Sequence, residues 1–150
     1  MNIEIIAVDK LREPYLRDGC ALYQQRLQPL LPVSISEVRP SAKDEGIIAE
    51  GEAILRRVDS DVLLWALDQS GHNITSHELA RKLSAAEQTG CRRLVLAIGG
   101  AIGLSPALRK RADFVWSLSE LTFLHEMARL IVLEQLYRAA KINRGEPYHR

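Results

Sequence analysis

The sequence predicts an α/β fold, with a mostly parallel β-sheet and helices on both of its faces. The stretches 62–67 (VLLWAL) and 93–98 (RLVLAI) are continuous apolar runs without alternation. Such runs are typical of strands that are covered on both faces in a parallel sheet. Strand patterns also alternate with helical patterns along the chain, and this order favours right-handed crossovers between parallel strands.

Three more strands complete the expected sheet. Residues 3–8 and 33–38 are short strand candidates, and 113–118 (DFVWSL) is rich in the β-favouring residues Phe, Val and Trp. Helical patterns occupy the intervals between the strands and the end of the chain. The helices are expected at 14–28, 43–58, 75–88, 105–111 and 123–142.

Two of these helices have recognisable starts. Thr75 or Ser76 is expected to cap the third helix, with Glu78 in its first turn. Thr122 is the expected cap of the last helix, with Glu126 in its first turn, where the helix dipole favours negative charge.

The last helix has more apolar residues than one stripe packed on a sheet would use. A second buried face needs a second partner, so we expect a homodimer built on this helix. The alternative is a terminal helix that is buried within its own domain. The apolar residues in question are Met127, Leu130, Ile131, Val132, Leu133, Leu136, Tyr137, Ala139 and Ala140.

Composition limits the class of protein. A chain of 150 residues, with 47% hydrophobic and 26% charged residues, predicts one globular domain over residues 1–150 and a cytoplasmic location, without a membrane span or signal peptide. Cys20 and Cys91 form no CxxC pair and have no nearby histidine at ligand spacing. Neither a disulfide framework nor a metal site is therefore expected.

The net charge of +1 does not indicate a nucleic-acid-binding protein by itself. Any basic surface must be local, and the end of the chain provides one candidate. A charge run is usually only a solvated face, which is the alternative here. Residues 138–150 contain Arg138, Lys141, Arg144 and Arg150 against Glu146.

Three expected loops follow the carboxyl ends of buried strands, where open α/β sheets bind ligands. In AIGGAIGLS (97–105), glycines allow positive φ and a close approach of a ligand, although the spacing matches neither a Walker A nor a GxGxxG motif. LSELTF (118–123) and LDQSG (67–71), which we expect to reverse the chain, follow two other strands. Backbone polar groups and apolar walls in these loops suit an uncharged heterocycle better than a triphosphate.

The strings IGGAIGLS and WSLSELTFLHEMARLIVLEQLYRAAKINRGEPYHR, with AVDKL and LDQSG earlier in the chain, resemble the RlmH (YbeA-like) family of SPOUT methyltransferases. The resemblance extends over the whole chain. It implies a SPOUT-type fold with a C-terminal trefoil knot, S-adenosylmethionine as methyl donor, a homodimer and a cytoplasmic location. The implied reaction is methylation of N3 of a pseudouridine in large-subunit (23S) ribosomal RNA within the assembled ribosome.

The resemblance also implies which residues contact the cofactor. Leu124 departs from the family pattern because proline is usual there, and the change loses a fixed φ and restores an N–H, which would loosen the pocket. Asp9 stands where glycine is common. The implied cofactor contacts are Leu67, Gly99, Leu118, Ser119, Glu120, Leu121, Thr122 and Phe123.

Methylation at N3 requires loss of the imide proton, so a general base or a charge-stabilising cation is needed. His149 and Tyr148 are the candidates for the base, and Arg129 or Arg150 for the cation. The tail would complete the pocket of the other subunit in a dimer; the alternative is a solvated terminus. For His125, in the first turn of the last helix, a hydrogen bond to a loop carbonyl is the alternative to a functional role. RNA phosphates are expected to contact Arg138, Arg144 and Arg150.

Two other functions remain open at this point. One is a SPOUT methyltransferase that acts on another RNA, such as a transfer RNA. The other is a non-catalytic RNA-binding or ribosome-assembly factor that retains the fold, with Leu124 as a sign of lost turnover.

Overall fold

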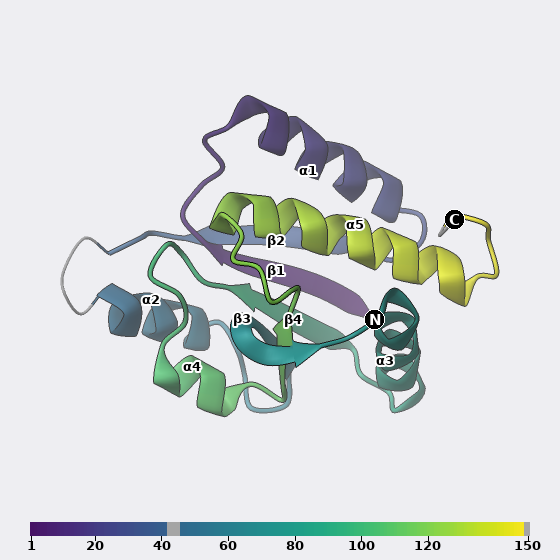
Figure 1. Ribbon diagram of the computed structural model, residues 1–150. Coiled ribbons are helices and arrows are strands. Elements are labelled where there is room, and N and C mark those ends of the chain that lie inside the picture. The colour runs from purple at the N-terminus through teal and green to yellow at the C-terminus, as the bar shows by residue number, and fades with distance from the viewer. Residues whose placement is uncertain (42–45, 149–150) are drawn as a thin grey trace.

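Five parallel strands form the central sheet of the computed structural model, which describes residues 1–41 and 46–148 (Figure 1). The strand order is β2-β1-β4-β3-β5. The two continuous apolar runs, β3 and β4, lie in the interior of the sheet, as the sequence predicts. The strands are β1 (Asn2–Val8), β2 (Val33–Val38), β3 (Leu63–Asn73), β4 (Arg93–Ile98) and β5 (Phe114–Ser117).

Helices cover both faces of the sheet, which confirms the predicted fold class. One hydrophobic cluster joins the sheet to α1, α3 and α5, and a second cluster joins its other face to α2 and α4. Residues 43–45 of the helix predicted at 43–58 lie outside the described residues, and the trefoil knot stays a prediction. The helices are α1 (Pro14–Leu27), α2 (Gly46–Leu55), α3 (Ser76–Gln88), α4 (Pro106–Arg111) and α5 (His125–Asn143).

Alternating side chains of the central strands enter the two clusters. On β4, Leu94 and Leu96 pack toward α1, α3 and α5, whereas Val95 and Ala97 pack toward α2 and α4. Successive residues of a strand point to opposite faces of the sheet, and both faces here are covered, so β4 is apolar throughout after Arg93 at its start. Each fully buried Leu contributes roughly 1.5–3 kcal/mol relative to an exposed one.

Strand β3 differs from the prediction, because LDQSG does not reverse the chain. The strand continues to Asn73, and its pairing with β5 shifts register between Leu67 and His72. Gly71 permits this close pairing, since a Cβ there would lie 2.5 Å from the carbonyl oxygen of Val115. The residues at this register shift lie at the same end of the sheet as the loops that follow β4 and β5.

The start of α5 also differs, and Thr122 does not cap it. The N-cap is Leu124, with φ −56° and ψ 134°, and no side chain accepts a capping hydrogen bond there. The Thr122 hydroxyl instead donates to Oε1 of Gln69 at 2.9 Å. Glu126 does lie in the first turn, and Thr75 caps α3 in a capping box with Glu78, so both of these predictions are confirmed.

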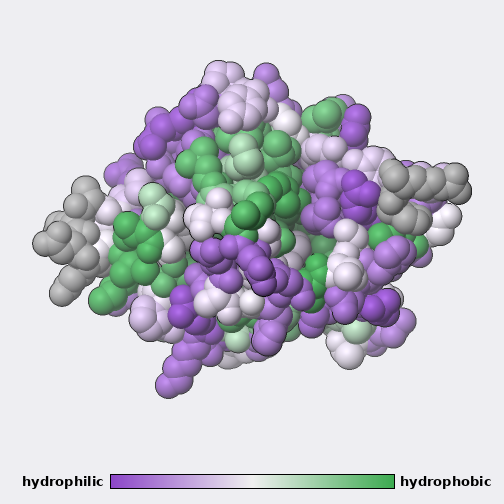
Figure 2. All heavy atoms as spheres, viewed as in Figure 1, coloured by the Kyte–Doolittle hydropathy of each residue, from purple (hydrophilic) through white to green (hydrophobic). Residues whose placement is uncertain are grey.

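Helix α5 packs between α1 and α3, and these contacts bury part of its apolar surface within the same chain. Figure 2 shows that apolar surface remains over α1 and the N-terminal half of α5. No helix among residues 1–41 and 46–148 is long and apolar enough to cross a membrane. The buried apolar residues of α5 are Val132, Leu133, Leu136, Ala139 and Ala140, and the half-buried ones are Met127, Leu130, Ile131 and Tyr137.

Candidate functional site

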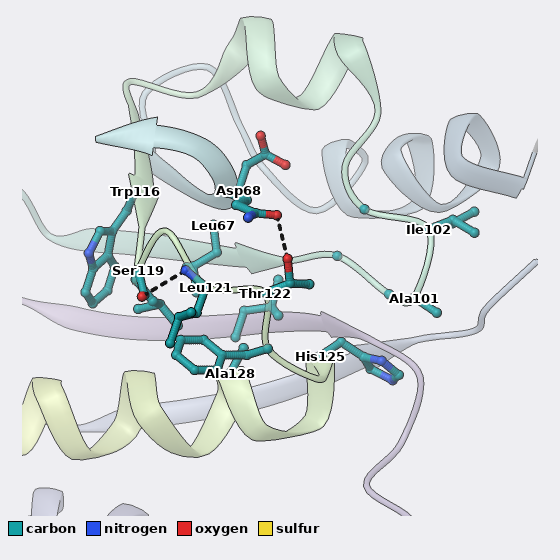
Figure 3. Close-up of a pocket in the computed structure, with 17 residues that line it drawn as sticks. Leu67, Asp68, Ala101, Ile102, Trp116, Ser119, Leu121, Thr122, His125 and Ala128 are labelled. Carbon is teal, nitrogen blue, oxygen red and sulfur yellow. Dashed lines mark hydrogen bonds between the residues drawn. The ribbon is translucent and has the colours of Figure 1, made fainter. Parts of the chain in front are cut away.

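A cavity of about 350 Å³ opens beside the register shift of β3 and at the carboxyl ends of β4 and β5, next to the first turn of α5 (Figure 3). The three strand-end segments predicted to form a ligand site therefore meet in space. Seven of the eight residues expected at the cofactor line this one cavity. They are Leu67, Gly99, Leu118, Ser119, Leu121, Thr122 and Phe123.

The glycine turn after β4 shapes one wall. The N–H of Gly103 donates to the carbonyl of Gly100 at 3.1 Å, and Gly103 has φ 89°, which favours glycine. A Cβ on Gly99 would lie 2.4 Å from the carbonyl oxygen of Gly103. The turn therefore closes tightly only because residue 99 has no side chain, and it leaves the backbone open to a ligand.

Gln69 ties the segment after β3 to the loop before α5. Its amide nitrogen donates to the carbonyl of Glu120 at 2.9 Å, and its amide oxygen accepts from the Thr122 hydroxyl at 2.9 Å. Within the loop, the N–H of Leu121 donates to Oγ of Ser119 at 3.0 Å (Figure 3). Glu120 is the one predicted cofactor residue that does not line the cavity, although its carbonyl holds the loop in place.

The sequence prediction missed several lining residues. Gln69 lies within the predicted segment 67–71 and Trp116 within the predicted strand 113–118, but neither was named individually as a ligand contact. Ile102 lies within the predicted glycine turn, and Ala128 lies one turn into α5. Ala128 could have been found from the helical spacing that places it near His125 on the same face.

The charge of the cavity wall is low. Asp68 is its one carboxylate among the described residues, and no lysine or arginine of that part of the chain lines it. Oδ2 of Asp68 accepts from the Arg109 guanidinium at 3.0 Å and from the N–H of Ser70 at 3.2 Å. A wall of this kind suits an uncharged or cationic ligand better than a polyphosphate, because no side chain there would neutralise phosphate charge.

His125 lines the cavity from the first turn of α5. Its Nε2 is buried and has no hydrogen-bond partner among the residues that the structure describes. The alternative of a hydrogen bond to a loop carbonyl is therefore not seen for this nitrogen. A buried unpaired ring nitrogen is a group that a bound ligand can satisfy.

Tyr148 lies at the opposite end of α5 from the cavity. Nineteen helical residues separate the two ends, which corresponds to about 28 Å. Its hydroxyl is 3.1 Å from the Tyr23 hydroxyl and 3.3 Å from Oε1 of Glu134. Burial, followed by these neighbours, raises the pKa of Tyr148 above its usual value. The catalytic candidate His149 and the candidate Arg150 lie outside the described residues.

The other candidate arginines are engaged in ion pairs. Arg129 is buried, donates to Oε2 of Glu37 at 2.9 Å, and does not line the cavity. Arg138 pairs with Glu134 at 2.5 Å, and this hydrogen bond raises the pKa of Arg138. Arg144 pairs with Glu146 at 2.9 Å. The structure therefore brings together the predicted cofactor residues but does not bring these arginines to them within one chain.

No cluster of three or more His, Cys, Asp or Glu side chains that could hold a metal ion occurs within the described part of the chain. The cavity chemistry therefore comes from backbone groups, hydroxyls, one amide, one carboxylate and one imidazole.

The comparisons with known proteins agree on one family. A family model described as "Predicted SPOUT methyltransferase" matches residues 1–149. The chain is 42% identical to the "Ribosomal RNA large subunit methyltransferase H" of Bifidobacterium adolescentis and 40% identical to that of Carboxydothermus hydrogenoformans. It is 44% identical to the "Putative ribosomal RNA large subunit methyltransferase H" of Methanoregula boonei. Each alignment covers 100% of both chains. The chain belongs to the SPOUT methyltransferase family.

Proposed function

We propose that this chain is an S-adenosylmethionine-dependent methyltransferase that modifies N3 of a pseudouridine in large-subunit ribosomal RNA. The observation that carries the proposal is the convergence of three strand-end segments in one cavity lined by seven of the eight expected cofactor residues. The names of the full-length relatives support large-subunit ribosomal RNA as the substrate. The methyl donor and the target atom follow from the resemblance to the RlmH family.

The cavity fits the proposed cofactor in size and chemistry. Its volume of about 350 Å³ lies in the range of small-molecule pockets, about 300–1,000 Å³. The glycine turn forms a wall of the cavity, and its close packing depends on the absence of a Cβ at Gly99. Leu67 and Leu118 provide apolar walls for a purine, and Asp68 adds a carboxylate that is already paired with Arg109 at 3.0 Å. S-adenosylmethionine, when bound, supplies an electrophilic methyl group on a sulfonium.

The chain's own task in the reaction is to position the acceptor base and to remove its N3 proton. Tyr148 is poorly suited as a general base, because its raised pKa keeps the phenol protonated at neutral pH. It is suited to stacking on a base or donating a hydrogen bond. His149 is the better candidate for the base, since the pKa of imidazole lies close to neutral.

We further propose that the chain acts as a homodimer in which the tail of one copy closes the pocket of the other. Tyr148 cannot reach the cavity of its own chain across the length of α5, about 28 Å, without unfolding the helix. An antiparallel copy of α5 would place its C-terminal end beside this cavity. The apolar surface over α1 and the N-terminal half of α5 supports such an arrangement (Figure 2). Leu130 and Ile131 of α5 are only half-buried in the single chain.

Mass analysis of ribosomal RNA tests the proposed reaction. RNA from a strain that lacks the protein is expected to lose one methyl group from a single large-subunit nucleotide, and expression of the full chain should restore it. A chain without residues 147–150 should still dimerise and bind the cofactor but restore little methylation. Unchanged methylation by the truncated chain would overturn the role of the tail.

Two other outcomes would change the assignment. A methyl group missing from a transfer RNA, with ribosomal RNA intact, would identify a different substrate. A purified chain that binds ribosomes but gives no calorimetric signal with S-adenosylmethionine would indicate a non-catalytic ribosome-binding factor.

A further inference from the structure

A second cavity, of about 550 Å³, lies on the other side of the first turns of α5. The loop after β1 and the start of α1 form one wall, and the end of β2 and the second turn of α5 form the other. The sequence analysis assigned a role to one of its lining residues, Arg129, as a cation that stabilises charge, and none to the others. The lining residues are Lys10, Leu11, Arg12, Arg17, Glu37 and Arg129.

The second cavity has an excess of positive charge. Glu37 is neutralised by Arg129 at 2.9 Å, and Asp9, which adjoins the cavity, pairs with Arg12 at 3.0 Å. Lys10 and Arg17 are exposed and have no carboxylate partner within 4.0 Å among residues 1–41 and 46–148. The guanidinium of Arg17 donates to the neutral carbonyl of Arg12 at 3.2 Å. Two uncompensated cations therefore face the same hollow.

The floor of the second cavity is a buried guanidinium. The side chain of Arg129 is only 4% exposed, and its Nε has no hydrogen-bond partner in the described part of the chain. A nearby anion stabilises a buried cation that has an unused hydrogen-bond donor, because burial has removed most of the cation's hydration. Glu37 supplies one such anion but is itself 41% exposed.

The loop after β1, which forms one wall of the second cavity, contains a strained backbone position at Asp9. Asp9 is the one non-glycine residue with positive φ in the described chain, at 73°. This conformation directs its carbonyl to the Arg129 guanidinium at 3.0 Å, while its carboxylate accepts from the N–H of Lys10 at 2.8 Å. Strained residues persist where the surrounding contacts hold them, and they are concentrated at functional sites. The loop that presents Lys10 is therefore fixed in position before any ligand binds.

The two cavities lie next to each other at the same edge of the sheet. Ala128 lines the first and Arg129 lines the second, and these are consecutive residues of α5. Both cavities therefore border the first two turns of α5, on different sides of the helix. An RNA whose base enters the first cavity and whose backbone passes over the start of α5 would meet the second. A basic site beside a nearly neutral one matches the division between phosphate contacts, which position RNA, and base contacts, which specify it.

We propose that the second cavity is a phosphate-binding subsite in which Lys10 and Arg17 hold the RNA backbone beside the methyl-donor pocket. The assignment of RNA as the ligand rests on the proposed function. Lys10 and Arg17 provide exposed cationic contacts, and Arg129 provides buried positive charge below them. Glu126 accepts from the N–H of Arg12, just before the N-cap Glu13, and so places a carboxylate beside the start of α1. We therefore assign the phosphate to the side chains and not to the helix end.

The test compares Lys10→Gln, Arg17→Gln and the double variant with the wild type. Purified ribosomes from a strain that lacks the methyltransferase serve as substrate, at several concentrations of KCl. Arg92→Gln is the matched control, because Arg92 is exposed and immediately precedes β4 at the opposite edge of the sheet. Thermal melting confirms that each variant is folded.

The double variant is expected to raise KM for ribosomes by about tenfold, with kcat and S-adenosylmethionine affinity unchanged. The slope of log affinity against log salt should decrease by about 0.7–0.9 for each phosphate that the variant no longer neutralises. The control should match the wild type in all four quantities. A double variant with wild-type KM and salt slope would overturn the subsite.

Two further results distinguish RNA binding at this subsite from the binding of a small anion and from the enzyme activity itself. If inorganic phosphate binds the wild type but not the double variant, and both bind ribosomes equally, the site takes a small anion and the RNA assignment is wrong. If the wild type binds ribosomes with the expected salt slope but transfers no methyl group, the subsite stands and the proposed enzyme activity fails.

Discussion

Replacement of Gly99 by alanine provides a direct test of the cradle in the proposed cofactor pocket. The new Cβ would lie 2.4 Å from the carbonyl oxygen of Gly103 and 2.8 Å from its carbonyl carbon, whereas ordinary contacts begin at 3.4 Å. Both contacts are with backbone atoms, which cannot rotate away as a side chain can. The turn must therefore open by roughly 1 Å, at a cost of about 1–3 kcal/mol typical of overpacking.

The consequence for binding follows from this displacement. The same turn forms a wall of the cavity, so we expect S-adenosylmethionine affinity to fall by about tenfold to hundredfold, which is about 1.4–2.8 kcal/mol. Isothermal titration calorimetry measures the affinity, and thermal melting measures the stability. Both should change in Gly99→Ala.

Gly90→Ala is the matched control for the loss of a glycine. Gly90 follows α3 and has φ 83°, and a Cβ on this residue would have no neighbouring atom within 4 Å. Alanine there should cost about 1–2 kcal/mol of stability through its left-handed backbone alone, with cofactor affinity unchanged. Wild-type affinity in Gly99→Ala, or equal loss of affinity in both variants, would refute the role of the glycine cradle.

Three other changes have defined outcomes. Leu124→Pro should raise Tm by about 1–3 °C in a melting experiment, because φ −56° suits proline, which restricts the unfolded chain; a lower Tm would contradict this. Hydrogen bonds from Thr75 lower the pKa of Glu78, so its contribution is present above the unfolded pKa of about 4.3 and is lost as pH falls through the folded pKa. Glu78→Gln should remove that part of the acid dependence in urea unfolding at pH 2–6, and an unchanged profile would count against it. Tyr148→Phe should abolish the tyrosine that ionises at the highest pH in an ultraviolet titration, since burial raises its pKa; persistence of that transition would assign it to another tyrosine.

The fold was predictable where local pattern and global packing agree. The apolar runs of β3 and β4 predict interior strands because both faces of the sheet are covered, and the alternate side chains indeed enter two clusters. The glycine turn and the loop 118–123 were predictable as segments that meet at one cavity, because each directly follows a buried strand.

The errors arose where long-range contacts override local signals. Thr122 has the chemistry of a helix cap, but its hydroxyl bonds to Gln69, which is 53 positions earlier in the chain. LDQSG has the composition of a turn, yet pairing with β5 extends the strand, because Gly71 allows Val115 to approach closely. Neither partner is visible in the local sequence.

The second cavity was not predictable for the same reason. Lys10 and Arg17 are ordinary surface cations in the sequence, and only the fold brings them to Arg129. The position of the tail likewise depends on the length and direction of α5, which separate Tyr148 from the cavity of its own chain.

A crystal structure of the chain grown with S-adenosylmethionine tests the central proposal most directly. The proposal predicts the cofactor between the glycine turn and residues 118–123, with the C-terminal tail of a second copy closing the cavity. A cofactor bound elsewhere, or a complex in which no second chain approaches the cavity, would contradict it.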